Sequence, residues 1–125
     1  MLHIVLGAVI LVGVVWHVAG LWLTSPPDVV DALLLRSPTP FSIYGVVALW
    51  ALMLAACAMA LQRKMHATRA RALHTMLVAL AAGGTVAHVV LIDGTLGTVS
   101  KIALSLALLL ALGTGLWRLK IWRRL

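Results

Sequence analysis

Four histidines occur in two apolar stretches of the chain, and their spacing is the feature best suited to chemistry. His3 and His17 stand fourteen residues apart, and His74 and His88 repeat that interval. Fourteen residues are two heptads, which return to nearly the same helix face with a drift of about 40° on a straight helix. The same interval spans about 21 Å along a helix axis. Each stretch is therefore expected to show two imidazoles on one face, one near each end.

Histidine is also the ionisable residue type found inside these stretches, whose centres contain no Asp, Glu or Arg. Ionisable groups at membrane depth are costly and usually functional. A lone histidine can simply bond to a neighbouring carbonyl, and His3 and His74 lie near enough to chain or segment ends to be interfacial. His66 falls among basic residues and is expected to be solvated. Four histidines in matched intervals favour ligation of a cofactor.

Composition indicates an integral membrane protein. The chain has 125 residues, of which 63% are hydrophobic and only 10% are charged, whereas a soluble domain has about a quarter of its residues charged. The single cysteine, Cys57, excludes a disulfide framework and a thiolate metal site. The net charge of +7 could suggest nucleic acid, but the basic residues flank apolar segments, as in membrane proteins. We therefore expect a lipid bilayer as partner and no nucleic acid.

Four segments reach the roughly 20 apolar residues that a membrane-spanning helix needs. The predicted helices are 2–23, 41–61, 72–92 and 98–119. Proline-rich connections at Pro26-Pro27 and at Pro38 to Pro40 resist helix continuation, and Asp93-Gly94 forms a turn. The first segment has no basic leader and is longer than the apolar part of a signal peptide. The prediction is an all-α, four-helix transmembrane bundle that forms one domain over residues 1–125.

Basic residues set the expected orientation. They gather in the 62–71 connection and the C-terminal tail, as Arg63, Lys64, Arg69, Arg71, Arg118, Lys120, Arg123 and Arg124. The positive-inside rule then predicts that both termini are cytoplasmic. The first and third helices therefore run in the same direction. This places His3 and His74 at the cytoplasmic level, and His17 and His88 at the outer level.

Facing imidazoles in a helix bundle can serve as axial ligands to haem iron. Two levels predict two haems, and these are of the non-covalent b type because the chain lacks a Cys-x-x-Cys-His motif. Small residues between the histidines would permit close backbone approach, although ordinary helix packing also uses them. These residues are Gly7, Gly13, Gly83 and Gly84.

Other side chains could contact the porphyrins. Cationic and hydroxyl groups can bind haem propionates, which makes Arg36 with Ser37 the outer candidates, Lys101 a second outer candidate, and Arg71 an inner candidate beside Arg63 and Arg69. Trp16 and Trp50 could pack on the rings. Topology alone explains the basic residues equally well, and an aromatic residue at helical spacing is more often plain packing.

These features resemble the haem-bearing core of the ferric reductase-like and NADPH oxidase membrane domains. The resemblance covers essentially the whole chain, and its carriers are the histidine register, the stretch from His17 to Trp22, the connection from Ser25 to Ser42, and residues 73–75 and 88–101. It implies a di-haem b membrane core with oxidoreductase-type electron transfer. The implied electron donor is a flavoprotein or a quinol on the cytoplasmic side, and the implied acceptor is an external ferric chelate, oxygen or quinone. Similarity to bacterial members implies the bacterial inner membrane.

The chain departs from this family in two respects. Family members usually have six membrane helices, and the four expected here correspond to the last four. Many relatives also carry a flavin- and nicotinamide-binding module, and this chain has no Gly-rich phosphate loop on a strand–helix unit. A homodimer or a partner subunit is therefore expected to cover the haem edges.

Three other functions fit parts of the pattern. A cofactor-free membrane anchor or assembly subunit predicts a colourless protein. A small transporter would need a membrane carboxylate, which the expected spans lack. A haem subunit of a larger quinone-linked complex would need a partner.

Overall fold

The computed structural model describes residues 1–64, 66–94 and 96–119, and this part of the chain consists of helices and short connections. Its long helices are α1 (Leu2–Thr24), α3 (Pro40–Ala60), α4 (Ala67–Leu91) and α5 (Thr98–Leu119). All four are long and apolar enough to cross a membrane. The predicted all-helical fold with four membrane helices is confirmed. Three basic residues used for the predicted orientation, Lys120, Arg123 and Arg124, lie outside the described residues.

Helix α4 begins five residues earlier than predicted. It starts at Ala67 rather than at residue 72, so Arg69 and Arg71 lie in its first two turns and not in the connection. The helix continues because Ala and Arg have high helix propensity and no Pro or Gly interrupts residues 66–82. Among the described elements, only the 3₁₀-helix η1 (Gln62–Lys64) lies between the end of α3 and the start of α4. The basic residues thus mark where the apolar stretch begins, and not where the helix begins.

The connection after α1 contains a short helix that the sequence analysis did not predict. Helix α2 (Pro26–Leu33) starts with two prolines, which are well tolerated at the first helical positions because no N–H is needed there. The hydroxyl of Ser25, just before the helix, donates a hydrogen bond to the carboxylate of Asp28. The two prolines therefore end α1 and also start α2. Val29 of this helix is buried.

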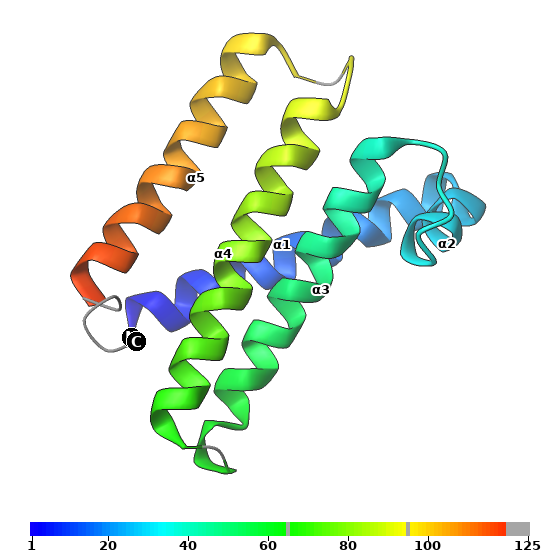
Figure 1. The fold of residues 1–125 in the computed structure, drawn as a ribbon. Coiled ribbons are helices and arrows are strands. Elements are labelled where there is room, and N and C mark those ends of the chain that lie inside the picture. Colours follow the sequence, from blue (N-terminus) through cyan, green and yellow to red (C-terminus); the bar gives the residue numbers. More distant parts are fainter. Residues whose placement is uncertain (65, 95, 120–125) are drawn as a thin grey trace.

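Helices α3 and α4 form the packed centre of the molecule (Figure 1). Their buried residues are nearly all small, namely Val46, Ala48, Ala51, Ala55 and Ala58 on α3 and Ala70, Ala81, Ala82 and Gly84 on α4. Four of the α3 alanines follow a 3-4-3 spacing, which keeps them on one face. Small residues let helix backbones approach closely, and close packing drives helix association in membranes.

The two outer long helices differ from this pair. Helix α5 lies beside α4, on the side away from α3, whereas α1 passes behind α3 and α4 at an angle to them (Figure 1). No residue of α1 is buried. Two straight helices that cross at an angle approach closely at one level only. Helix α1 therefore contacts the central pair over a short stretch only, and most of its apolar side chains are exposed.

Candidate functional site

Both histidines of α4 lie on the face that packs against α3. The Nδ1 atom of His74 is 3.1 Å from the carbonyl oxygen of Ala55, and Nδ1 of His88 is 2.8 Å from the carbonyl oxygen of Phe41. His74, Ala81 and His88 are seven residues apart, so the imidazoles extend the same line of residues as the buried alanine. The fourteen-residue interval thus does place two imidazoles on one helix face.

These hydrogen bonds fix which ring nitrogen carries the proton. A carbonyl oxygen can only accept, so Nδ1 is the donor in each bond. In a neutral imidazole, Nε2 is then unprotonated and has a lone pair that can accept a proton or bind a metal. Histidines that bind metals commonly donate their other ring N–H to a backbone carbonyl in this way. Helix α3 therefore leaves Nε2 unprotonated in the neutral form of both histidines of α4.

At one of the two levels the structure brings a second imidazole to α4. The ring centroids of His3 and His74 are 6.1 Å apart, and the ring planes are nearly perpendicular at 86°. His3 is exposed and His74 is half-buried. Of the predicted ligand pairs, this is the one whose members are in contact.

At the other level the partner of His88 is not a histidine. No ring contact or hydrogen bond joins His17 to His88 in the described part of the chain, and His17 is exposed. The ring of His88 instead meets Phe41, with centroids 5.8 Å apart at 61°. The oblique path of α1 accounts for this difference, because α1 crosses behind α4 and α3 at an angle and does not run along α4 (Figure 1).

The four predicted glycines divide into two kinds. A β-carbon on Gly7, Gly13 or Gly83 would meet nothing within 4 Å, so these residues border open space. Gly84 is buried, and a β-carbon there would lie 2.9 Å from the carbonyl oxygen of Tyr44 and 3.1 Å from the β-carbon of Ala48. The close approach at Gly84 is therefore between α3 and α4 themselves.

Of the other predicted contact residues, Trp16, Trp50 and Arg36 are exposed and Ser37 is half-buried. Trp16 and Trp50 are 80% and 53% exposed. Arg36 is exposed, and Ser37 shares a hydrogen bond of 2.8 Å with the Thr39 hydroxyl.

Arg71 is exposed and lies three residues before His74 in α4. Residues at this spacing are neighbours on a helix surface. Arg71 thus lies next to His74 on the surface of α4.

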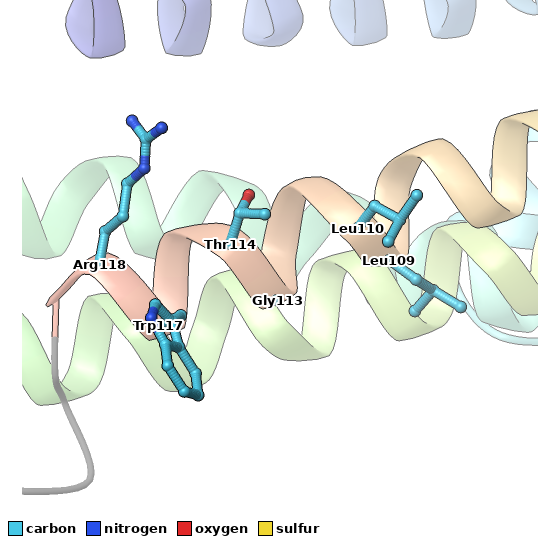
Figure 2. Close-up of a pocket in the computed structure, with 6 residues that line it drawn as sticks. All are labelled: Leu109, Leu110, Gly113, Thr114, Trp117 and Arg118. Carbon is cyan, nitrogen blue, oxygen red and sulfur yellow. The ribbon is translucent and has the colours of Figure 1, made fainter.

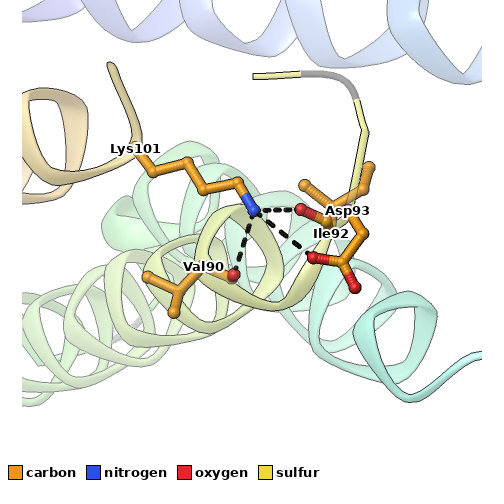
Figure 3. A network of polar contacts seen from close by, with 4 residues as sticks. All are labelled: Val90, Ile92, Asp93 and Lys101. Carbon is orange, nitrogen blue, oxygen red and sulfur yellow. Dashed lines mark hydrogen bonds and ion pairs between the residues drawn. The ribbon is translucent and has the colours of Figure 1, made fainter. Parts of the chain in front are cut away.

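Lys101 has a structural role at the end of α4. Its ammonium donates hydrogen bonds to the carbonyl oxygens of Val90, at 3.3 Å, and of Ile92, and lies 3.9 Å from the carboxylate of Asp93 (Figure 3). The Lys101 side chain is 14% exposed. The last carbonyls of a helix lack intrahelical partners and carry partial negative charge. Lys101 therefore caps α4 from α5, a few residues after His88.

Two hollows lie along α5, away from the histidines. The larger, of about 360 Å³, is lined by Leu109, Leu110, Gly113, Thr114, Trp117 and Arg118, all from α5 (Figure 2). The smaller, of about 250 Å³, lies between α4 and α5 and is lined by Thr85, Val86, Val89, Leu104, Ser105 and Leu108. Neither hollow includes a predicted haem ligand.

Three residues of α3 that define the environment of the histidines were not predicted from the sequence. They are Phe41 and Ala55, whose carbonyls accept the imidazole bonds, and Gly45, over which the His88 ring lies. Phe41 and Ala55 are themselves fourteen residues apart. This interval equals the one between His74 and His88 on the antiparallel helix α4. The equality could have identified Phe41 and Ala55, but only if the register of α3 against α4 had been known.

Comparisons with protein-family models, with curated proteins and with solved structures found no match to this chain. Among the described residues, no group of three or more His, Cys, Asp or Glu side chains could hold a metal ion. The candidate site consists of the paired imidazoles of His3 and His74 and, at the other level, the imidazole of His88 against Phe41.

Proposed function

We propose that this protein is a membrane cytochrome core whose histidines hold two b-type haems and which passes electrons across the bilayer. When bound, such haems supply one-electron redox chemistry, and two histidine ligands fill both axial positions of the iron, which favours electron transfer over oxygen binding. His3 and His74 are assigned to the cytoplasmic level, and His17 and His88 to the outer level.

The observation that carries the proposal is the pairing of His3 with His74. Two imidazoles that bind one metal ion from opposite sides, with metal–nitrogen bonds of about 2 Å, have ring centres roughly 6 Å apart. The measured separation is 6.1 Å, and the bond from His74 Nδ1 to Ala55 leaves its Nε2 available. Edge-to-face ring contacts also fall in this range of separations, so spectroscopy has to distinguish the two.

Open space beside the glycines also supports the proposal. Gly7 lies one helical turn after His3, and a β-carbon there would meet no atom outside its own stretch of helix within 4 Å. Gly13 and Gly83, between the histidines of their helices, share this property. Near His74, Arg71 would stabilise an anionic propionate by a charge-assisted hydrogen bond.

The outer level needs a further condition. His88 has its Nδ1 bonded to Phe41 in the same way as His74 to Ala55, but His17 has to approach it. This requires α1 to lie along α4 rather than across it. We assign His17 because it is the one other histidine of α1 and repeats the interval of α4.

Direction and partners complete the proposal. The basic residues around the junction of α3 and α4 support, by the positive-inside rule, a cytoplasmic location for that connection and for both termini. The membrane we propose is a bacterial inner membrane, as the family resemblance implies. A flavoprotein or quinol would then donate electrons at the His3–His74 level, and a ferric chelate, oxygen or quinone would accept them outside. A second copy of the chain or another subunit would cover the exposed apolar faces of α1.

The test is the reduced-minus-oxidised spectrum and the haem-to-protein ratio of the detergent-purified protein loaded with haem. We expect two low-spin b haems per chain, loss of one haem in His74→Ala, and loss of the other in His88→Ala. The matched control is His66→Ala, which removes the one histidine outside the proposed sites and should keep both haems. A colourless wild-type protein would overturn the proposal. Retention of two haems in His17→Ala would overturn the outer assignment alone.

A further inference from the structure

The two backbone carbonyls of α3 that accept hydrogen bonds from α4 are fourteen residues apart, which is also the interval between the two imidazoles of α4. Moving from His74 to His88 advances fourteen residues along α4, and the bonded carbonyl moves back fourteen residues along α3, from Ala55 to Phe41. This is the register of two antiparallel helices with matched heptads. The two imidazole bonds therefore repeat one local arrangement at two levels of the helix pair.

At the His88 level this arrangement depends on a glycine. A β-carbon on Gly45 would lie 2.8 Å from Nδ1 of His88, 3.0 Å from its Cε1 and 3.3 Å from its Cγ. In proteins, a β-carbon essentially never lies closer than 3.0 Å to an atom of a residue that is not its neighbour in the chain. The imidazole thus occupies the space that any other residue at position 45 would fill, and this lets Nδ1 reach the Phe41 carbonyl one turn earlier.

The role of Gly45, which is half-buried, differs from that of the buried glycine Gly84. A β-carbon on Gly84 would meet the backbone and a methyl group of α3, and no imidazole atom is among its nearest neighbours. Gly84 therefore sets how closely the helices pack, whereas Gly45 sets where the His88 ring lies.

We infer that Gly45 is a positioning residue that holds His88 as the Nδ1–H tautomer, with Nε2 free, by letting its ring lie against α3 and donate to the Phe41 carbonyl. With an alanine at position 45, the ring has to leave this carbonyl or α3 has to shift. The tautomer is a property of the chain without cofactor. Its use for ligation rests on the proposed function, in which Nε2 of His88 is a metal ligand.

The direct test is NMR of the haem-free protein with ¹⁵N-labelled histidine, in detergent at alkaline pH, where imidazole is neutral. We expect His74 and His88 to be protonated at Nδ1 in the wild type. In Gly45→Ala, His88 should no longer be protonated at Nδ1, whereas His74 should remain so. The unchanged His74 also shows that α3 and α4 are still paired. Gly83→Ala is the matched control, since its β-carbon meets nothing within 4 Å, and it should leave both rings unchanged. An Nε2–H tautomer of His88 in the wild type, or an unchanged His88 in Gly45→Ala, would overturn the inference.

A double-mutant cycle keeps the inference testable if Gly45→Ala folds poorly. Gly45→Ala should lower the midpoint of SDS-induced unfolding when His88 is present. In the His88→Ala background the same change should have no effect, because the clashing ring is gone. Equal destabilisation in both backgrounds would show that Gly45 does not act through His88.

Haem binding separates this inference from the proposed function. A metal-binding histidine that loses the hydrogen bond on its other ring nitrogen typically binds the metal about 10–100-fold more weakly. Gly45→Ala should therefore weaken haem binding at the His88 site by that factor and leave the His74 site unchanged. A protein with the expected tautomers that binds no haem would overturn the proposed function and leave the role of Gly45 intact.

Discussion

The imidazoles of α4 show how one residue type can satisfy a membrane interior and still be reactive. Each has two ring nitrogens with opposite roles in the neutral form. His74 and His88 each place one nitrogen against a carbonyl of α3, which avoids the cost of an unpaired polar group in an apolar region. The second nitrogen remains for chemistry. A carboxylate or a lysine at these positions would be charged in water and costlier to bury.

Lys101 gives a prediction at the same scale. Replacing it by methionine removes the donors to Val90 and Ile92 while keeping a long side chain. Since hydrogen bonds from charged donors contribute about 1.5–3 kcal/mol, Lys101→Met should lower the free energy of unfolding in SDS by about 2 kcal/mol. Lys101→Arg should recover most of this loss.

The Lys101 ion pair supplies the control. Asp93 is fully exposed and 3.9 Å from the Lys101 ammonium, and exposed pairs contribute little. Asp93→Asn should therefore leave the unfolding midpoint unchanged. A midpoint in Asp93→Asn as low as in Lys101→Met would show that the ion pair, and not the helix cap, links α5 to α4.

At the scale of elements, the pairing of α3 with α4 holds the described structure together. Its buried residues are alanines, one valine and one glycine. Because nearly all of them are small, the two backbones lie close and the α3 carbonyls come within reach of the α4 imidazoles. Helices α1 and α5 contribute no buried residues of their own. The site geometry on α4 is therefore set by one helix pair, and α1 adds His3 at one end.

Adjacent glycines on α4 allow a matched test of this pairing. In Gly84→Ala the new β-carbon would lie 2.9 Å from the Tyr44 carbonyl oxygen, and such overpacking typically costs about 1–3 kcal/mol. We expect that loss in SDS unfolding of the Gly84→Ala protein. Gly83→Ala borders open space and should be neutral or slightly stabilising, because alanine favours helix. Equal effects of the two substitutions would contradict the arrangement of α3 against α4.

For the whole molecule, the arrangement leaves a large apolar surface on α1 and α5, which suits lipid contact or contact with another chain. Leu2, Ile4, Trp16 and Leu110, for example, are each more than 60% exposed. Charged residues lie near the helix ends instead. A soluble protein would not expose such a surface.

Orientation gives the prediction at this scale. In a Cys57→Ser background, which removes the one native thiol, Asp93→Cys should react with a membrane-impermeant maleimide added to intact cells. Lys64→Cys should react only after the cells are permeabilised, because its connection is expected in the cytoplasm. The measurement is labelling of the purified protein. The opposite pattern would reverse the proposed direction of electron flow.

The sequence by itself determined the four apolar helices and the presence of two histidines on one face of α4, because both follow from local composition and helical period. The helix start at Ala67 and the short helix α2 were not predicted, since charge and proline were interpreted as ends of helices although neither forbids a helix there.

Only the tertiary structure decided what the histidines meet. The sequence analysis placed α1 parallel to α4 and so paired histidines at both levels, but the crossing of α1 brings His3 to His74 and leaves His17 apart from His88. The tertiary structure also decided that Ala55, Phe41 and Gly45 of α3 lie against the imidazoles of α4. These contacts depend on the register and crossing angle of helices, which arise from packing between distant segments. The period of a single helix carries no information about either quantity.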